Sequence, residues 1–518
     1  WYNYILPGDI MLTASRIRGA FLALPHFHMV LKKVCCSLQN LLIKIPGYKD
    51  ALKALKKGEL PMLVSGLAGS AAALAAASLF QEGGVKGALL VIAPGTDQAA
   101  AWAGDLEQLM PDRQVLVFDP AEALPFEVVA ASREPAAGRL QTLAALLSGN
   151  QPVVIAPVEA LLPKLIPAGD WERAAISLRV NQEIDYSSLP CCLIQAGYER
   201  LENALAPGQF AVRGDVVDIY PFYGEPVRLE FWGDEITSIR ELDPETQRSH
   251  KSLDLIKVWP AREFVYDPEL ADAALERIRE GYKKRRDQIK GNRSALSRLQ
   301  LRVNRLLEMA GEGAGSLNLV QPYFYPEQVS LLDYLPTGSL VIMDDPGRFA
   351  EQSRGRTALL ESDYRRLFQE GNSFTPWQKH YFDGEQLLKQ LVEFPLIGLS
   401  RLLTRVDFPL KSHFSFSTKE MHSFLGRPDL LVQEVREWLR RKTTVLLLAR
   451  TDVNLKQLER ELRDLEMSFS IDEVWQEHLE EGRLQVGTGF LSRGFEVPGI
   501  LAVVTAEEMY RRGSGRGG

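Results

Sequence analysis

The chain has 518 residues, of which 46% are hydrophobic and 25% charged, a composition typical of a globular protein with about three or four domains. Its net charge of -7 argues against a protein that coats DNA with its whole surface, and no run reaches the ~20 apolar residues of a membrane span. The cysteines are two adjacent pairs without metal-ligand spacing, Cys35-Cys36 and Cys191-Cys192, so we expect reduced thiols in a cytoplasmic protein without a metal site or membrane contact.

Both ends of the chain look cut or appended, because it starts at Trp1 and finishes in a glycine-rich tail, 513–518. Residues 1–43 match no pattern that we can use. An upstream extension or an authentic amphipathic arm would each account for them. We therefore expect a fragment with an unassigned N-terminal extension and a truncated tail.

A strand, a glycine-containing turn and an alanine-rich helix are predicted over 60–80, which is the arrangement of a phosphate-binding loop. A working loop of the form G-x-x-x-x-G-K-[ST] needs a lysine for the β and γ phosphates and a hydroxyl for Mg²⁺. Counting from Gly66, these two positions hold Ala72 and Ala73. The sequence therefore predicts a degenerate nucleotide site.

The turn of this degenerate loop keeps one weaker possibility. Backbone N–H groups around Gly69 and Ser70 would still hold an anion loosely. A tight strand-to-helix turn kept for packing is the simpler interpretation.

The next segment alternates buried-strand runs with helices. Strands are predicted at 87–93, 114–118 and 152–156, and helices at 96–110 and 158–165. This alternation predicts an α/β fold with a doubly wound parallel sheet.

Residues 197–236 alternate apolar and polar side chains in short runs broken by turns at 206–208 and 223–226, which predicts antiparallel strands. Arginine beside exposed aromatic rings is the composition of a protein-docking patch. An ordinary sheet whose aromatic residues are core remains the alternative. The residues expected on or near the wet face are Arg200, Arg213, Asp215, Asp218, Tyr220, Phe222, Arg228, Glu230, Phe231 and Trp232.

After this stretch, a long helix is predicted to begin with Asp267 as its N-cap and Pro268 at its first position, and its charged pattern runs to about Gly311. The basic run 283–286 could touch DNA phosphates. A solvated helix face is the simpler explanation.

Two further α/β segments follow. An apolar strand within 330–349 ends in Asp344-Asp345, and acidic residues there either hold Mg²⁺ or cap a helix. Residues 364–416 indicate mixed helix and strand that complete a second lobe. A small α/β domain is predicted from Pro428, with helices 429–441 and 453–465 and strands 443–449, 484–486 and 500–505.

The docking stretch resembles the UvrA-binding domain shared by UvrB and the bacterial transcription-repair coupling factors (Mfd). Four ordered phrases carry the resemblance: Tyr-x-Arg at 198–200, Gly-x-Phe-x-x-Arg-Gly at 208–214, Tyr-Pro at 220–221 and Phe-x-x-Asp-Glu-Ile at 231–236.

Three features separate the two relatives. In UvrB the segment corresponding to 119–139 is a long tyrosine-rich hairpin, whereas here it is short and contains no tyrosine. Leu-Ser-x-Gly-Phe-Glu-x-Pro at 491–498 and the phrase at 505–510 resemble the coupling factors and have no counterpart in UvrB. The resemblance therefore favours the N-terminal half of a coupling factor, over about residues 45–512.

The resemblance implies a domain division. We expect a UvrB-like lobe 1a with the degenerate loop over 44–177, a UvrA-binding-like β domain over 178–260, the long helix and lobe 1b over 261–420, and the small α/β domain over 428–512.

The resemblance also implies a function in transcription-coupled nucleotide-excision repair. The full-length family is an ATP-dependent, helicase-like hydrolase that needs ATP and Mg²⁺, translocates on double-stranded DNA, releases stalled RNA polymerase and recruits UvrA. For this chain we expect no cofactor and no catalysis, UvrA as partner through Arg200, Arg213 and Phe222, and polymerase and DNA contacts through a missing C-terminal half.

Two alternatives stay open at this point. A UvrB-like ATP-dependent helicase or excision-nuclease component would need the nucleotide site formed by Gly66, Gly69, Ser70, Asp344 and Asp345 to work. The family also suggests a docking patch that a C-terminal segment covers until activation.

Overall fold

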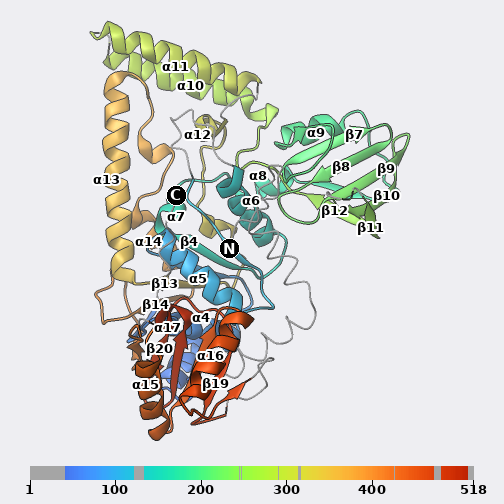
Figure 1. Cartoon of the computed structure of the whole chain (residues 1–518). Helices are drawn as coiled ribbons and strands as arrows, with labels where there is room; N and C mark the ends of the chain where they lie inside the picture. The colour runs from blue at the N-terminus through green and yellow to red at the C-terminus, as the bar shows by residue number, and fades with distance from the viewer. Residues whose placement is uncertain are drawn as a thin grey trace, which may run out of the picture.

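The computed structural model describes residues 41–121, 133–243, 246, 248–289, 291–312, 317–424, 426–471 and 480–510. The predicted α/β class is confirmed, with a parallel lobe, a mainly antiparallel docking domain beside it and a small α/β domain at one end (Figure 1). Predictions for 1–40, including Cys35-Cys36, and for 513–518 lie outside these residues. No helix among the described residues is long and apolar enough to cross a membrane.

The lobe is built on one seven-stranded sheet in the order β15-β1-β14-β13-β2-β4-β3, and its strand pairs are parallel. Strands from both predicted lobes interleave in it, since β14 lies between β1 and β13. Sequence pattern shows where strands are but not which strand lies beside which. The strands are β1 (Met62–Ser65), β2 (Leu89–Ala93), β3 (Val115–Val117), β4 (Val153–Pro157), β13 (Leu340–Asp344), β14 (Leu396–Ser400) and β15 (Ser412–Ser415).

Helices cover both faces of this sheet, which is why its central strands are apolar throughout. Leu90 and Ile92 of β2 belong to one core cluster, and Leu89 and Val91 face the other. The helices are α3 (Tyr48–Lys57), α4 (Ala71–Glu82), α5 (Thr96–Leu109), α6 (Arg133–Leu147), α7 (Val158–Leu161), α8 (Ala168–Arg173), α12 (Gln321–Phe324), α13 (Pro346–Glu370) and α14 (Gly384–Leu391), with short turns η1 (Leu317–Leu319), η2 (Leu331–Tyr334) and η3 (Trp377–Lys379).

Two helix predictions need correction. The helix expected over 158–165 ends at Leu161, because Pro163 lacks a backbone N–H and its segment bridges to Tyr381 instead. The long helix to Gly311 is two packed helices, α10 (Pro268–Gln288) and α11 (Arg293–Glu312). Asp267 caps α10 as predicted, and its carboxylate accepts from the Glu269 N–H at 2.9 Å.

The docking domain is a six-stranded sheet in the order β11-β10-β9-β8-β7-β6, antiparallel except for the β6–β7 pair. Helix α9 (Leu189–Gln195) and the separate pair β5 (Ile176–Arg179) and β12 (Leu255–Val258) complete it. Its other strands are β6 (Glu199–Arg200), β7 (Gln209–Arg213), β8 (Val216–Tyr220), β9 (Val227–Trp232), β10 (Glu235–Leu242) and β11 (Ser249–Ser252).

The small domain carries a six-stranded sheet in the order β16-β20-β21-β17-β19-β18. One face of this sheet packs into a core cluster that it shares with the lobe, through residues such as Leu446, Phe495 and Val503. Leu41 and Leu42 also lie in that shared core. The elements are β16 (Lys419–Glu420), α15 (Pro428–Arg440), β17 (Thr444–Ala449), α16 (Asp452–Asp464), β18 (Ser470–Ile471), β19 (Leu484–Thr488), β20 (Phe495–Val497), β21 (Leu501–Thr505) and α17 (Ala506–Met509).

A buried ion pair fixes the segment that leaves the docking domain to the lobe. Arg139 of α6 is 2% exposed, and its guanidinium donates to both carboxylate oxygens of Glu263, to one of them at 2.8 Å. The same guanidinium donates to the Asp119 carbonyl at 2.8 Å and lies over the Phe118 ring. Removing the carboxylate would leave a buried charge without its counter-ion.

Glu263→Ala should therefore destabilise the protein by about 3 kcal/mol, because the buried Arg139 loses its compensation. Urea unfolding followed by tryptophan fluorescence measures the change. Glu172→Ala is the matched control, since its pair with Lys257 is solvent-exposed and should contribute less than ~1 kcal/mol. Equal effects of the two variants would contradict the buried-pair argument.

Docking face and occupied phosphate loop

Three backbone N–H groups of the loop between β1 and α4 donate hydrogen bonds to other parts of the protein. The Leu67 N–H donates to the Ser400 carbonyl at 3.1 Å, and the Ala68 N–H donates to Thr418 Oγ1 at 2.7 Å. The Ser70 N–H donates to the Arg493 carbonyl at 3.2 Å. The expectation that N–H groups near Ser70 would hold an anion is wrong for Ser70, because its backbone donor is already used.

The glycines of the loop are explained by close packing. Gly66 and Gly69 both have positive φ, 84° and 55°. A Cβ on Gly66 would lie 1.7 Å from the Phe416 carbonyl oxygen, and one on Gly69 would lie 2.5 Å from the Gly494 carbonyl oxygen. The packing interpretation of this turn therefore has a direct steric basis.

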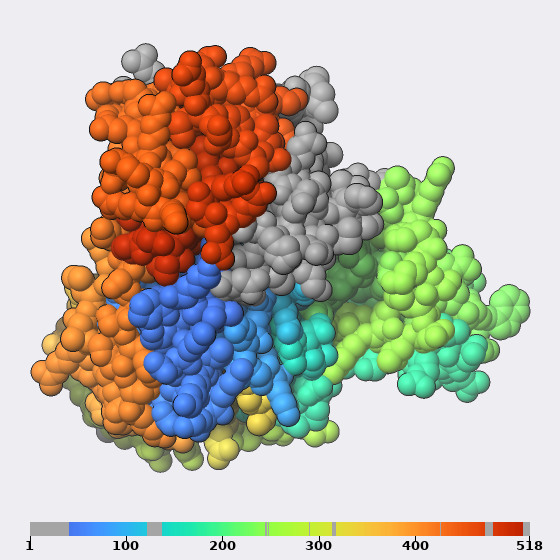
Figure 2. All heavy atoms as spheres, turned by 90° about the horizontal axis from the view of Figure 1, so that it is seen from below, coloured from blue at the N-terminus to red at the C-terminus, as the bar shows by residue number. Residues whose placement is uncertain are grey.

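The segment that packs against the loop, Leu491 to Gly494, comes from the small domain. Ser492 donates its N–H and its hydroxyl to the two carboxylate oxygens of Asp105, at 2.5 and 2.8 Å. The Arg493 N–H donates to the Ser70 hydroxyl at 3.1 Å. Figure 2 shows the small domain, orange to red, directly against the blue start of the lobe. Sequence analysis found this phrase as a family signature but missed its role as the occupant of the loop.

Asp105 of α5 is almost fully buried at this contact. Burial raises the pKa of its carboxyl to about 6, against the hydrogen bonds from Ser492 and Ser70, which favour the ionised form. The contact therefore joins the lobe and the small domain through a buried carboxylate, and both of its oxygens accept a hydrogen bond from Ser492.

The acidic pair expected at the second ATPase motif is also engaged within the protein. Trp102 Nε1 donates to Asp344 Oδ2 at 2.8 Å. Burial raises the pKa of the Asp344 carboxyl to about 6, and the nearby Asp345 adds to the shift. Asp345 occupies the N-cap position of α13 but its side chain makes no capping hydrogen bond.

These residues do not fit a nucleotide with its metal ion. Ala72 and Ala73 offer neither an amine nor a hydroxyl, and the loop beside them is packed against residues 492–494. Within the described part of the chain, no group of three or more His, Cys, Asp or Glu side chains is placed to hold a metal ion.

The outward face of the docking sheet, here called the docking face, is set by strand alternation. Cross-strand pairs place Asp218 beside Arg228 and Val216 beside Glu230, with Arg213 paired to Val216 on the same side. The intervening residues, such as Val217 and Leu229, are buried in the domain core.

Asp218 organises the arginines of this face. Its side chain is 1% exposed, and it accepts from Arg228 Nε and Nη2 at 2.7 and 2.8 Å while also pairing with Arg213. The hydrogen bond to Asp218 raises the pKa of Arg228, so the guanidinium stays charged. Arg213 also donates to Asn203 Oδ1 at 3.0 Å, yet keeps 43% of its side chain exposed.

The other predicted contact residues are scattered. Arg200 is exposed on the edge strand β6, in register with Phe210 of β7. Phe222 lies against Gly208 and packs toward the lobe core, so the structure does not bring it to Arg213. Phe231, expected near the wet face, is 5% exposed and faces the core, because it alternates with Glu230.

Trp232 is the strongest contact candidate that sequence analysis left out of its site residues. It ends β9 opposite Glu235 and is 80% exposed, although a tryptophan side chain is costly to leave in water. Exposed aromatic anchors beside arginine are typical of protein interfaces. Its position on the outward side of β9 follows from the same alternation that buries Phe231.

Comparison with known proteins first defines the class of the docking domain. Residues 176–264 match the model of the UvrB interaction domain family. The chain thus carries a UvrB-type interaction domain beside the lobe with the seven-stranded sheet.

Longer matches extend the comparison to almost the whole chain. The transcription-repair-coupling factor of Bacillus subtilis (strain 168) is 29% identical over 92% of this chain, and those of Staphylococcus haemolyticus and Staphylococcus epidermidis are 26% and 25% identical over 88%. The chain spans only 40% of the first relative and 38% of the other two. The chain is therefore similar to transcription-repair-coupling factors over most of its length.

Asp344→Asn should stabilise the protein at pH 8 by about 1 to 3 kcal/mol. With its pKa raised from 3.8 to about 6, the folded state binds the proton more tightly, so this carboxyl's contribution to stability falls as pH rises through that interval. An asparagine oxygen still accepts from Trp102. Denaturant unfolding at pH 5 and pH 8 measures the effect, with Asp464→Asn at an exposed position of α16 as control. A destabilised Asp344→Asn protein at pH 8, or an unchanged pH slope, would contradict the assignment.

Restoring the two missing side chains should not restore ATP binding. The variant Ala72→Lys with Ala73→Ser regains the amine and the hydroxyl, but residues 492–494 still contact the loop. Titration calorimetry with ATP and Mg²⁺ should give a dissociation constant above ~1 mM for both the variant and the parent chain. Micromolar binding by the variant would show that the loop is accessible after all.

Proposed function

We propose that this chain is the UvrA-recruiting part of a coupling factor that links stalled transcription to nucleotide-excision DNA repair. The observation that carries the proposal is the coincidence of the UvrB interaction match, 176–264, with an exposed face that carries fixed arginines and a bare tryptophan. UvrA would bind this docking face. The surrounding lobe would serve as its rigid support.

The docking face suits this role because its charges are held in place before a partner arrives. Asp218 orients Arg213 and Arg228, so less side-chain entropy is lost on binding. Trp232 would supply apolar contact area, and the arginine forks would pair with carboxylates of the partner.

Catalysis belongs to other parts of the full-length protein in this proposal. The relatives are about two and a half times as long as the stretch matched here. ATP and Mg²⁺, double-stranded DNA and the stalled RNA polymerase would be bound by those other parts. Such a complex acts on the bacterial chromosome, which places it in the cytoplasm.

The UvrB-like helicase or nuclease alternative is not favoured. It needs a nucleotide at loop 66–70, where the backbone donors of Leu67, Ala68 and Ser70 are already bonded within the chain. The matched relatives bear the name of coupling factors.

Trp232→Ala should weaken UvrA binding at least ~30-fold, since a central aromatic anchor contributes about 2 kcal/mol or more. Its melting temperature should not change, because the side chain is 80% exposed. Surface plasmon resonance with immobilised UvrA from the same genome measures the affinity.

The matched control is Leu255→Ala, which removes a 51% exposed apolar side chain of β12, outside the six-stranded sheet. It should bind UvrA like the parent chain. Failure of the parent chain to bind would overturn the proposed function. Normal binding by Trp232→Ala would overturn only the role of this side chain.

A further inference from the structure

The end of the helical hairpin formed by α10 and α11 gathers positive charge in a chain that is acidic as a whole. The two helices lie across one end of α13, with α10 ending at Gln288 and α11 beginning at Arg293 (Figure 1). Residues 281–300 contain seven lysines and arginines but only one acidic residue, Asp287, whereas the whole chain carries a net charge of -7. The basic run 283–286 is thus part of a larger positive cluster.

Two of these cations fasten the hairpin to α13. Arg285 is buried, donates to the Phe368 carbonyl at 2.6 Å and lies over the ring of the same residue. Arg298 Nε donates to the Glu370 carbonyl at 2.6 Å. Both carbonyls belong to the last turn of α13, which is the negative end of the helix dipole. These two arginines are therefore engaged within the chain.

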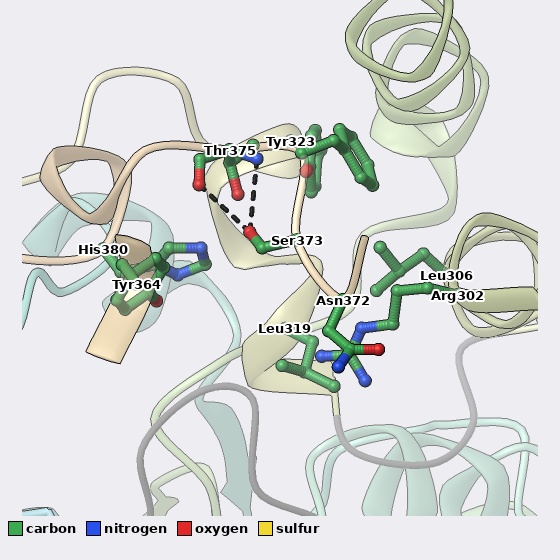
Figure 3. Close-up of a pocket in the computed structure, with 10 residues that line it drawn as sticks. Arg302, Leu306, Leu319, Tyr323, Tyr364, Asn372, Ser373, Thr375 and His380 are labelled. Atoms are coloured by element: carbon green, nitrogen blue, oxygen red, sulfur yellow. Dashed lines mark hydrogen bonds between the residues drawn. The ribbon is translucent and has the colours of Figure 1, made fainter. Parts of the chain in front are cut away.

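The loop that follows α13 also supports the hairpin. Figure 3 shows Arg302 and Leu306 of α11 beside Asn372, and the three side chains line one hollow. The loop is held by its own hydrogen bonds, because the Ser373 hydroxyl donates to the Thr375 carbonyl at 3.0 Å and accepts from the Thr375 N–H at 3.3 Å. The hairpin thus presents its end on a fixed support.

Three other cations lie on one outward side of the hairpin. The Arg286 guanidinium carbon lies 5.9 Å from the centre of the Tyr282 ring, and the Tyr282 hydroxyl donates to Gln300 of α11, so this side of α10 meets this side of α11. Lys283 is three positions before Arg286, and Arg293 is seven before Gln300. Helical spacing places each pair on one face of its helix.

The charge on this side is not neutralised within the described part of the chain. Lys283 and Arg293 are exposed, and no described carboxylate lies within ion-pair distance of either. Arg286 lies 3.3 Å from Asp287, but both side chains keep more than 40% of their surface in solvent, at 42% and 45%. Such an exposed pair contributes less than ~1 kcal/mol, so a phosphate can compete for this guanidinium.

We propose that the hairpin end, defined as Lys283, Lys284, Arg286 and Arg293, binds the phosphates of double-stranded DNA. Duplex DNA presents a dense row of charges and rewards several cations on one rigid surface. Binding of single strands relies on exposed aromatic faces, and the only aromatic residue in 281–300, Tyr282, is covered by Arg286. The contact would add to those expected in other parts of the full-length protein and does not depend on the docking face.

The test is fluorescence anisotropy of a labelled 30-base-pair duplex with the full 518-residue chain. Three phosphate contacts predict a dissociation constant of roughly 10 µM at 50 mM NaCl and about 40-fold weaker binding at 200 mM. Combined Lys283→Ala, Arg286→Ala and Arg293→Ala should weaken binding at 50 mM at least ~10-fold and flatten the salt dependence. Its circular-dichroism melt should match that of the parent chain, because these side chains are mainly in solvent.

The matched control removes the same charge elsewhere. Lys49, Lys53 and Lys56 are exposed on α3, and their combined replacement by alanine should leave DNA binding unchanged. Equal losses in the two triple variants would overturn the proposed surface, as would a parent chain that does not bind the duplex at 50 mM NaCl. Equally tight binding of poly-glutamate would overturn the assignment to DNA.

A lysine footprint provides a second measurement that needs no variant. Acetic anhydride should modify Lys283 and Lys284 several-fold more slowly when the duplex is bound, while the exposed Lys53 and Lys56 react at the same rate as before. Mass spectrometry reads the extent of modification at each position. Unchanged reactivity of Lys283 and Lys284 under saturating duplex would overturn the proposal, because the DNA would then lie elsewhere.

Discussion

The contact between residues 491–494 and the loop at Ser70 is the constraint on which the arrangement of the lobe and the small domain depends. A backbone N–H can serve a phosphate oxygen or the Arg493 carbonyl, but not both. Because Ser70 donates to Arg493 and Asp105 accepts twice from Ser492, the loop between β1 and α4 is part of an interface between the lobe and the small domain. The shared core around Phe495 extends that interface into apolar packing.

The alanines of α4 take part in this packing. Nine of the twelve residues of the helix are buried, including Ala73 at 2% exposure, because the helix lies between the parallel sheet and neighbouring elements. A lysine at 72 would require a partner for its ammonium, and the loop beside it is already packed against residues 492–494. The buried alanines and the domain contact thus belong to one packed region.

Much of this structure follows from local sequence signals. The parts that do not follow depend on contacts between residues far apart in the sequence. Counting from Gly66 is enough to find the missing lysine, and Asp267 with Pro268 marks the start of α10 because caps are local. The placing of Phe231 near the wet face was wrong, although strict alternation with Glu230 would have corrected it. The bond from Ser70 to Arg493 joins residues more than 400 positions apart, and no local pattern encodes such a pairing.

Fixed contacts also explain how the lobe supports the docking face. A binding surface gains affinity from side chains that are already fixed, because ordering a mobile side chain on binding costs conformational entropy. Here a buried carboxylate fixes the arginines, and the Arg139–Glu263 pair and the stacked rings of Trp171 and Trp259 fix the docking domain to the lobe. Residues 491–494 contact the loop between β1 and α4 and join the lobe to the small domain, so the docking domain rests on a packed support.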